Sequence, residues 1–221
     1  MKKILVPTDF SEQANIALKA AAGIARKSSA EIILLHIIDL PHEAMDMIQP
    51  GYDVPEIMFF KEHAEAKLTQ TSLSEELSGL NVSQILKLGR TFDEVTEVAK
   101  ANNIDLIVMG SHGASGFKEL FIGSNTEKVI RTSNIPVLAI KGDETEVSFD
   151  KVVFANDFTE ETAKGFQKIV DFLKLNGSTP HFLMVNTPNN FKPTHVAEAM
   201  AHEFLKQYNL DNYEFSIYND L

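Results

Sequence analysis

Cysteine is absent from the 221 residues of the chain. Its absence excludes disulfide bonds, thiol catalysis and thiolate metal sites. Long apolar runs are absent as well, since none approaches the ~20 residues that a membrane-spanning helix needs. The short apolar start is followed at once by Asp9, which is too early for a signal peptide. We therefore expect a soluble, cytoplasmic protein that does not insert into a membrane.

Basic residues are scarce relative to acidic ones. Lys and Arg number 20 against 31 Asp and Glu, which gives a formal net charge of −11. An acidic surface repels both the phosphate backbone of nucleic acids and anionic membranes, so we expect neither as a partner. The charge does not exclude one small anion held locally by backbone amides. The length allows one large domain or two small ones.

Short apolar runs alternate with helical patterns over the first 140 residues. Strands are expected at residues 3–6, 31–38, 82–88, 106–109 and 136–140. Helices are expected at residues 14–24, 55–77, 91–101 and about 124–132, with Thr91 as a helix cap. The alternation predicts an α/β fold: an open parallel five-stranded sheet in the order 3-2-1-4-5, with helices on both faces. Ligands bind such sheets beyond the carboxyl ends of the strands, where the strand order reverses, next to Asp9 and Gly110.

The beginning of this pattern is repeated later in the chain. Residues 3–12 align with residues 151–160 at an offset of 148, and the same offset carries Leu35-His36-Ile37 onto Leu183-Met184-Val185. One helix is expected between the two aligned segments of the second copy, with Ala163, Phe166, Val170 and Leu173 on one face. We therefore predict a first domain at residues 1–141, a linker at 142–149 and an incomplete βαβαβ copy at 150–221.

The second copy stops after its third strand, at residues 213–218. Its first strand, Lys151–Ala155, then has no fourth strand beside it and presents an open edge. We expect another chain or segment to cover that edge, or the chain to be part of a longer protein.

The segment from Met109 to Thr126 is rich in glycine. It follows an apolar strand and leads into a helix, a combination that holds phosphate because glycine allows close approach and the helix start offers free N–H groups. Glycines after a strand are often only turn residues. The segment is not a P-loop, because the Gly-Lys-Ser/Thr ending is missing.

At these residues the sequence resembles the universal stress protein family. The nucleotide-binding signature of that family is Gly, two residues, Gly, nine residues, Gly, then Ser or Thr, and Gly110, Gly113, Gly123 and Ser124 match it here. The segments at residues 6–11 and 34–39 also look like the family. The resemblance covers residues 1–141 well and residues 150–221 as a partial second domain.

The resemblance implies an adenine-nucleotide site of the ATP-binding branch of the family. The adenosine end would be lined by Pro7, Thr8 and Asp9, with Ile37 meeting adenine through its backbone and Met109 and Gly110 contacting the ribose and adenine side. The phosphates would be held by Gly113, Gly123, Ser124, Asn125 and Thr126. Family members often have a small apolar residue in place of Asn125, a change of little weight if that position acts through its N–H group. The second copy has Ala155 and Asn156 in place of Pro7 and Thr8 and lacks the phosphate segment, so we expect no ATP there.

Several of these residues have simpler interpretations. Asp9 could cap the first helix instead of, or as well as, touching a ribose. His112 could sense phosphate charge or be a solvent-exposed loop residue, and Lys118 is a weak phosphate candidate. His36 is expected to be a hydrogen-bonded core histidine. No metal cluster with ligand spacing is expected, although Mg²⁺ or Mn²⁺ would arrive with the nucleotide phosphates.

The resemblance favours an ATP-binding regulatory protein of the stress response that has no catalytic residues. One alternative is a slow ATPase or a nucleotidyl-transfer enzyme, for which the signature offers only His112 and Lys118. The other is a scaffold that binds no nucleotide. Family members commonly dimerise through the fifth strand, so we expect a homodimer through Val137–Ile140 or pairing of the open edge Lys151–Ala155.

Overall fold

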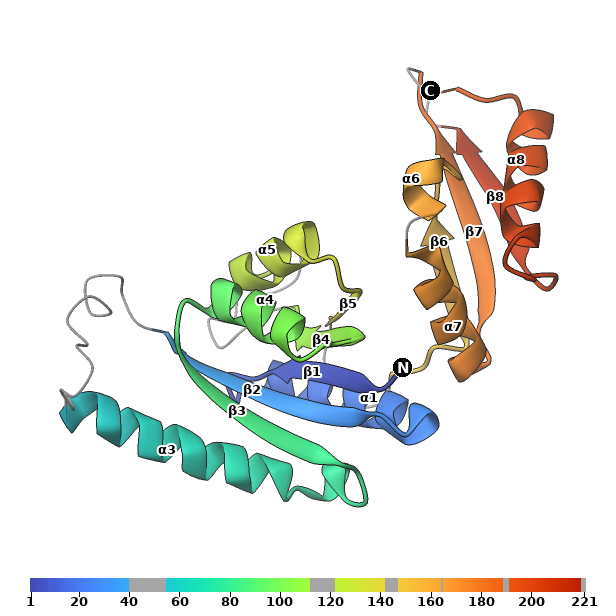
Figure 1. Cartoon of the computed structure of the whole chain (residues 1–221). Coiled ribbons are helices and arrows are strands. Elements are labelled where there is room, and N and C mark those ends of the chain that lie inside the picture. Colours follow the sequence, from blue (N-terminus) through green and yellow to red (C-terminus); the bar gives the residue numbers. More distant parts are fainter. Residues whose placement is uncertain (40–54, 112–121, 142–146, 164, 189–190, 220–221) are drawn as a thin grey trace. The chain divides into compact units, whose positions relative to one another are not determined.

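The computed structural model describes residues 1–39, 55–111, 122–141, 147–163, 165–188 and 191–219. The chain divides into two compact units, Met1–Val147 and Ser148–Leu221. Each unit is a parallel sheet with helices packed on it (Figure 1).

The first unit contains a five-stranded parallel sheet. Its strands are β1 (Lys3–Pro7), β2 (Glu31–Asp39), β3 (Val82–Gly89), β4 (Leu106–Gly110) and β5 (Val137–Ile140). Their order is β3-β2-β1-β4-β5, which confirms the predicted order, and each strand differs from its predicted range by one residue at one end.

Helices cover both faces of this sheet. They are α1 (Glu12–Ser28), α3 (Pro55–Ser72), α4 (Thr91–Ala101) and α5 (Ser124–Thr132). Figure 1 shows α1 and α3 on one face and α4 and α5 on the other.

The helix predicted to reach residue 77 ends at Ser72, and Glu75–Leu77 form a separate 3₁₀ turn. The Ser72 hydroxyl donates to the Thr69 carbonyl at 2.8 Å, and Ser74 is extended at φ −64° and ψ 155°. Serine side chains compete with helical backbone bonds in this way, which accounts for the early end.

The core of the first unit lies on both sides of the sheet because side chains alternate along each strand. On one side, Leu5 and Leu35 pack in one cluster with Val95 and Val98 of α4 and Val129 of α5. The intervening strand residues point to the other face and are fully buried as well: Ile4, Val6, Ile32 and Leu34. Burial of successive residues is typical of a parallel sheet covered on both faces.

The second unit is a partial copy of the first. Its strands β6 (Lys151–Ala155), β7 (Thr179–Asn186) and β8 (Glu214–Asn219) are parallel and lie in the order β6-β7-β8. Its helices are α6 (Glu160–Ala163), α7 (Phe166–Asn176) and α8 (Thr194–Lys206). Lys3 pairs with Glu31 and Lys151 pairs with Thr179, so the two copies share one strand register at the offset of 148.

The turn after the first strand is also repeated. Phe10 and Phe158 both adopt left-handed backbone angles, with φ of 63° and 55°. In each copy the phenylalanine N–H donates to a side-chain oxygen two residues earlier, Oγ1 of Thr8 at 3.0 Å and Oδ1 of Asn156 at 2.6 Å. The repeat therefore extends to individual hydrogen bonds.

The single helix predicted after this turn in the second copy is wrong. The chain forms α6 and α7, separated by Gly165 at φ 85°. That angle suits glycine and breaks a right-handed helix. The equivalent position in α1 is Ala17, a strong helix former, and α1 continues through it.

Helices α7 and α8 pack on the same face of the second sheet. The rings of Phe166 (α7) and Phe204 (α8) lie 4.9 Å apart and share one core cluster with Phe182 of β7. On the opposite face, Val153 is 66% exposed and Tyr218 is 60% exposed.

Within the described residues β6 pairs with β7 alone, so its other edge is open, as the sequence predicts. Coverage of that edge by another chain stays a prediction. None of the described helices is long and apolar enough to cross a membrane.

Phe182→Ala should destabilise the second unit by about 3–5 kcal/mol, because it removes a fully buried ring and leaves a cavity. Val153→Ala, on the neighbouring strand but exposed, should change stability by less than about 0.5 kcal/mol. Urea unfolding followed by amide hydrogen exchange of residues 148–221 measures both effects. Equal midpoints for the two variants would contradict the assigned core.

Candidate functional site

A cleft lies at the carboxyl edge of the first sheet. Ten of the predicted site residues line it: Pro7, Thr8, Asp9, Ile37, Met109, Gly110, Gly123, Ser124, Asn125 and Thr126. Its volume is ≈ 200 Å³. The predicted residues His112, Gly113 and Lys118 lie outside the described residues.

The strand order explains why these residues meet. Strands β1 and β4 are neighbours, with Ile4 paired to Leu106, but β1 leads to β2 on one side and β4 leads to β5 on the other. The connections leave in opposite directions and open a crevice between the two strand ends, which is the usual ligand position in open α/β sheets.

The start of α5 forms one wall of the cleft. The first N–H groups of a helix have no partner within the helix, and the three residues that carry them here, Ser124, Asn125 and Thr126, line the cleft. The N-cap is Gly123, at φ −58° and ψ 146°, angles that any residue adopts. What glycine contributes here is the lack of a side chain, because no cap hydrogen bond occupies the N–H groups.

Three hydrogen bonds attach this helix start to the sheet. The Thr126 hydroxyl donates to the Gly110 carbonyl at 2.9 Å, and Thr126 is 4% exposed. The Gly123 N–H donates to the Ser111 carbonyl at 2.7 Å, and the Ser111 N–H donates to the Ile140 carbonyl at 2.8 Å. The N–H groups at the start of α5 are therefore held in place relative to the ends of β4 and β5.

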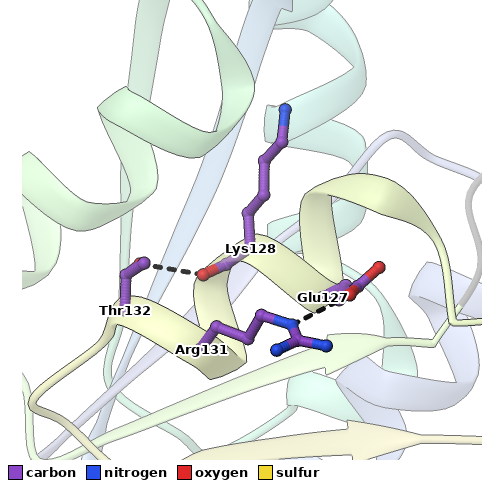
Figure 2. A network of polar contacts seen from close by, with 4 residues as sticks. All are labelled: Glu127, Lys128, Arg131 and Thr132. Carbon is purple, nitrogen blue, oxygen red and sulfur yellow. Dashed lines mark hydrogen bonds and ion pairs between the residues drawn. The ribbon is translucent and has the colours of Figure 1, made fainter.

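The exposed side of α5 carries its own stabilising contacts, shown in Figure 2. Arg131 Nε lies 2.9 Å from Glu127 Oε1, and the Thr132 hydroxyl donates to the Lys128 carbonyl at 2.8 Å. The acidic residue in the first turn and the basic residue in the last complement the helix dipole. These contacts leave the N-terminal N–H groups untouched.

The turn after β1 forms another part of the lining. Ser11 caps α1, because its hydroxyl accepts from the Ala14 N–H at 3.2 Å. The Asp9 carboxylate accepts from the Ser11 N–H at 3.0 Å. The interpretation of Asp9 as the helix cap is therefore wrong, and Asp9 is an exposed carboxylate on the wall of the cleft.

Three further lining residues escape the sequence patterns, namely Ala14, Leu35 and Thr91. Thr91 is the first residue of α4 and not its cap, because the N-cap is Arg90 and makes no side-chain cap bond. Gly89, at φ 150°, allows this entry, since residues with a side chain rarely adopt that backbone angle. A Gly-x-Thr sequence that begins at the last residue of a strand is the signal that could have located Thr91.

Acidic and imidazole groups do not gather into a metal site among the described residues. No three His, Asp or Glu side chains there are close enough to hold one ion. The described lining residues also include no Lys or Arg.

Comparison with known proteins identifies the family to which this chain is similar. Residues 1–141 match the universal stress protein family. Universal stress protein MJ0577 of Methanocaldococcus jannaschii is 37% identical over 153 residues, which span 63% of this chain and 94% of that protein. MJ0531 of the same organism is 30% identical over 140 residues, spanning 63% of this chain and 82% of that protein.

Solved structures are similar across both units. The crystal structure of a universal stress protein from Archaeoglobus fulgidus matches 99% of this chain and 79% of its own chain, with a TM-score of 0.75 and 23% identity. At that identity the likeness shows the fold, and it extends to the partial second copy.

Thr126→Val should destabilise the first unit by about 1–3 kcal/mol, because the Gly110 carbonyl loses its buried donor while the shape is kept. Thr132→Val removes an exposed hydroxyl from the same helix and should have an effect below about 0.5 kcal/mol. Chemical denaturation of both variants makes the comparison. If the two lose equal stability, the hydroxyl does not secure the helix start.

Proposed function

Because the chain belongs to the universal stress protein family, we propose that its first unit binds an adenine nucleotide, ATP foremost. The protein then acts as a nucleotide-dependent regulator in the stress response and has no dedicated catalytic residues. The observation that carries the proposal is the uncapped start of α5, whose N–H groups line the cleft.

The lining combines two kinds of chemistry, as a nucleotide does. Leu35, Ile37 and Met109 provide apolar surface at the strand ends. Ser124 and Asn125 provide amide donors and a helix dipole, which favour phosphate. An adenine base against the apolar surface and phosphates at the start of α5 satisfy both.

Charge supports the same orientation. The Asp9 carboxylate would repel phosphates, but it accepts hydrogen bonds from sugar hydroxyls, so the ribose belongs on that side. Phosphate charge is then balanced by amides, by the helix dipole and by a divalent ion such as Mg²⁺ or Mn²⁺ that the phosphates carry with them. This mode of binding is compatible with a chain of net charge −11.

A rival function is a slow ATPase or a nucleotidyl-transfer enzyme. Fast hydrolysis needs a group that orients water and a group that neutralises developing charge. Among the described lining residues only Asp9 has an ionisable side chain, and one carboxylate cannot both orient water and neutralise developing negative charge. A phosphate-release rate near 1 per second or faster would favour the enzyme.

Assembly is part of the proposal. β5 lies at one edge of the five-stranded sheet and, within the described residues, pairs with β4 alone. We propose a homodimer through Val137–Ile140, and sedimentation of the purified protein tests it.

The proposal is tested first by heating the purified protein and identifying any nucleotide that is released. Calorimetric titration with ATP, ADP, AMP and adenosine then measures how affinity depends on the phosphates. Absence of both co-purified nucleotide and binding would overturn the proposal in favour of a scaffold.

Asn125→Asp should weaken ATP binding at least about tenfold, because it places a negative charge beside the phosphates. The same change should leave stability unchanged or slightly raised, since an acidic residue in the first turn suits the helix dipole. Asn125→Ala is the control and should keep wild-type affinity, because the position acts through its N–H group. Equal affinity of Asn125→Asp and Asn125→Ala would place the phosphates elsewhere.

A further inference from the structure

His36 lies between two residues that line the cleft but is not itself part of the lining. Side chains alternate along β2, so Leu35 and Ile37 line the cleft while His36 points to the opposite face. The His36 ring is half-buried and packs against the Phe10 ring with 4.4 Å between centroids. Its Nδ1 lies 2.8 Å from the Thr8 carbonyl, so this nitrogen carries the proton and donates it.

This hydrogen bond orients a peptide unit of the cleft wall. The Thr8 N–H already donates to the Leu35 carbonyl at 2.8 Å, and His36 binds the other end of the same residue. A peptide unit is planar and trans, so its carbonyl and the next N–H point in opposite directions. Holding the Thr8 carbonyl therefore also fixes the direction of the Asp9 N–H, and both residues line the cleft.

The second copy shows what the turn needs in order to form. The Asn156 N–H donates to the Leu183 carbonyl at 3.0 Å, and Phe158 adopts φ 55°. The residue equivalent to His36 is Met184, which offers no donor. The same turn thus forms without an imidazole. The presence of a histidine at position 36 is therefore not explained by the need to form the turn.

The aromatic ring of the turn differs between the copies too. Phe158 is 6% exposed and lies within 6.1 Å of the rings of Phe182 and Phe204 in the core. Phe10 is half-buried between His36 and the ammonium of Lys67, which lies 5.4 Å from the ring centroid. The copy with the cleft is the copy in which a histidine and a lysine contact the phenylalanine of the turn.

We propose that His36 is a positioning residue of the nucleotide site, which orients the Thr8–Asp9 peptide for the ligand without touching it. This role rests on the proposed function. Lys67 adds a contact through Phe10, so α3 supports the same turn.

The test uses the residue that the chain itself places in the second copy. His36→Met keeps a side chain of similar size but removes the donor, and it should raise the Kd for ATP about tenfold, the worth of one hydrogen bond. His36→Asn retains an N–H donor near the place of Nδ1 and should restore the Kd to within about twofold of wild type. His63→Met, an exposed change on α3, is the matched control and should bind as wild type does.

Two measurements on the full chain separate the outcomes. The urea midpoints of His36→Met and His36→Asn measure the effect of each change on stability, while the Asp9 amide signal in ligand-free NMR spectra should shift in His36→Met and return in His36→Asn. Wild-type ATP affinity in His36→Met, or failure of His36→Asn to restore it, would overturn the positioning role alone. A wild-type protein that binds no nucleotide would overturn the proposed function and this role together.

Discussion

The hydrogen bond from the Thr126 hydroxyl to the Gly110 carbonyl is the constraint on which the cleft depends. It joins the first turn of α5 to the last residue of β4 across a connection of 13 residues. A helix start can serve as an anion site only if its N–H groups stay in one place relative to the rest of the site. The buried hydroxyl provides that fixed distance, and the Gly123–Ser111 backbone bond reinforces it.

The two copies show how one sequence pattern serves two structural roles. Leu5 and Val153 occupy equivalent positions, yet Leu5 is fully buried under α4 and α5 whereas Val153 is 66% exposed. On the other face both copies keep an apolar core. The shared turn and register indicate a common local structure, and the helices that follow decide which face becomes interior.

The strand order and most of the cleft could be predicted because they depend on local signals. The glycine spacing located the start of α5, and the internal repeat located β6 and β7. Ala14 and Leu35 could not be found this way, since they reach the cleft only through the packing of α1 and β2 around it. The break between α6 and α7 was missed because it depends on the left-handed angle of Gly165, which helical spacing does not reveal.

An uncapped helix start also has a thermodynamic consequence for the whole domain. A helix that begins at Gly123 lacks the side-chain cap bond of Ser, Thr, Asn or Asp, which costs about a few tenths of a kcal/mol when glycine takes their place. Any anion that binds there shifts the folding equilibrium by mass action, in proportion to the logarithm of its concentration. The heat resistance and cellular lifetime of such a domain would then increase with the concentration of its ligand.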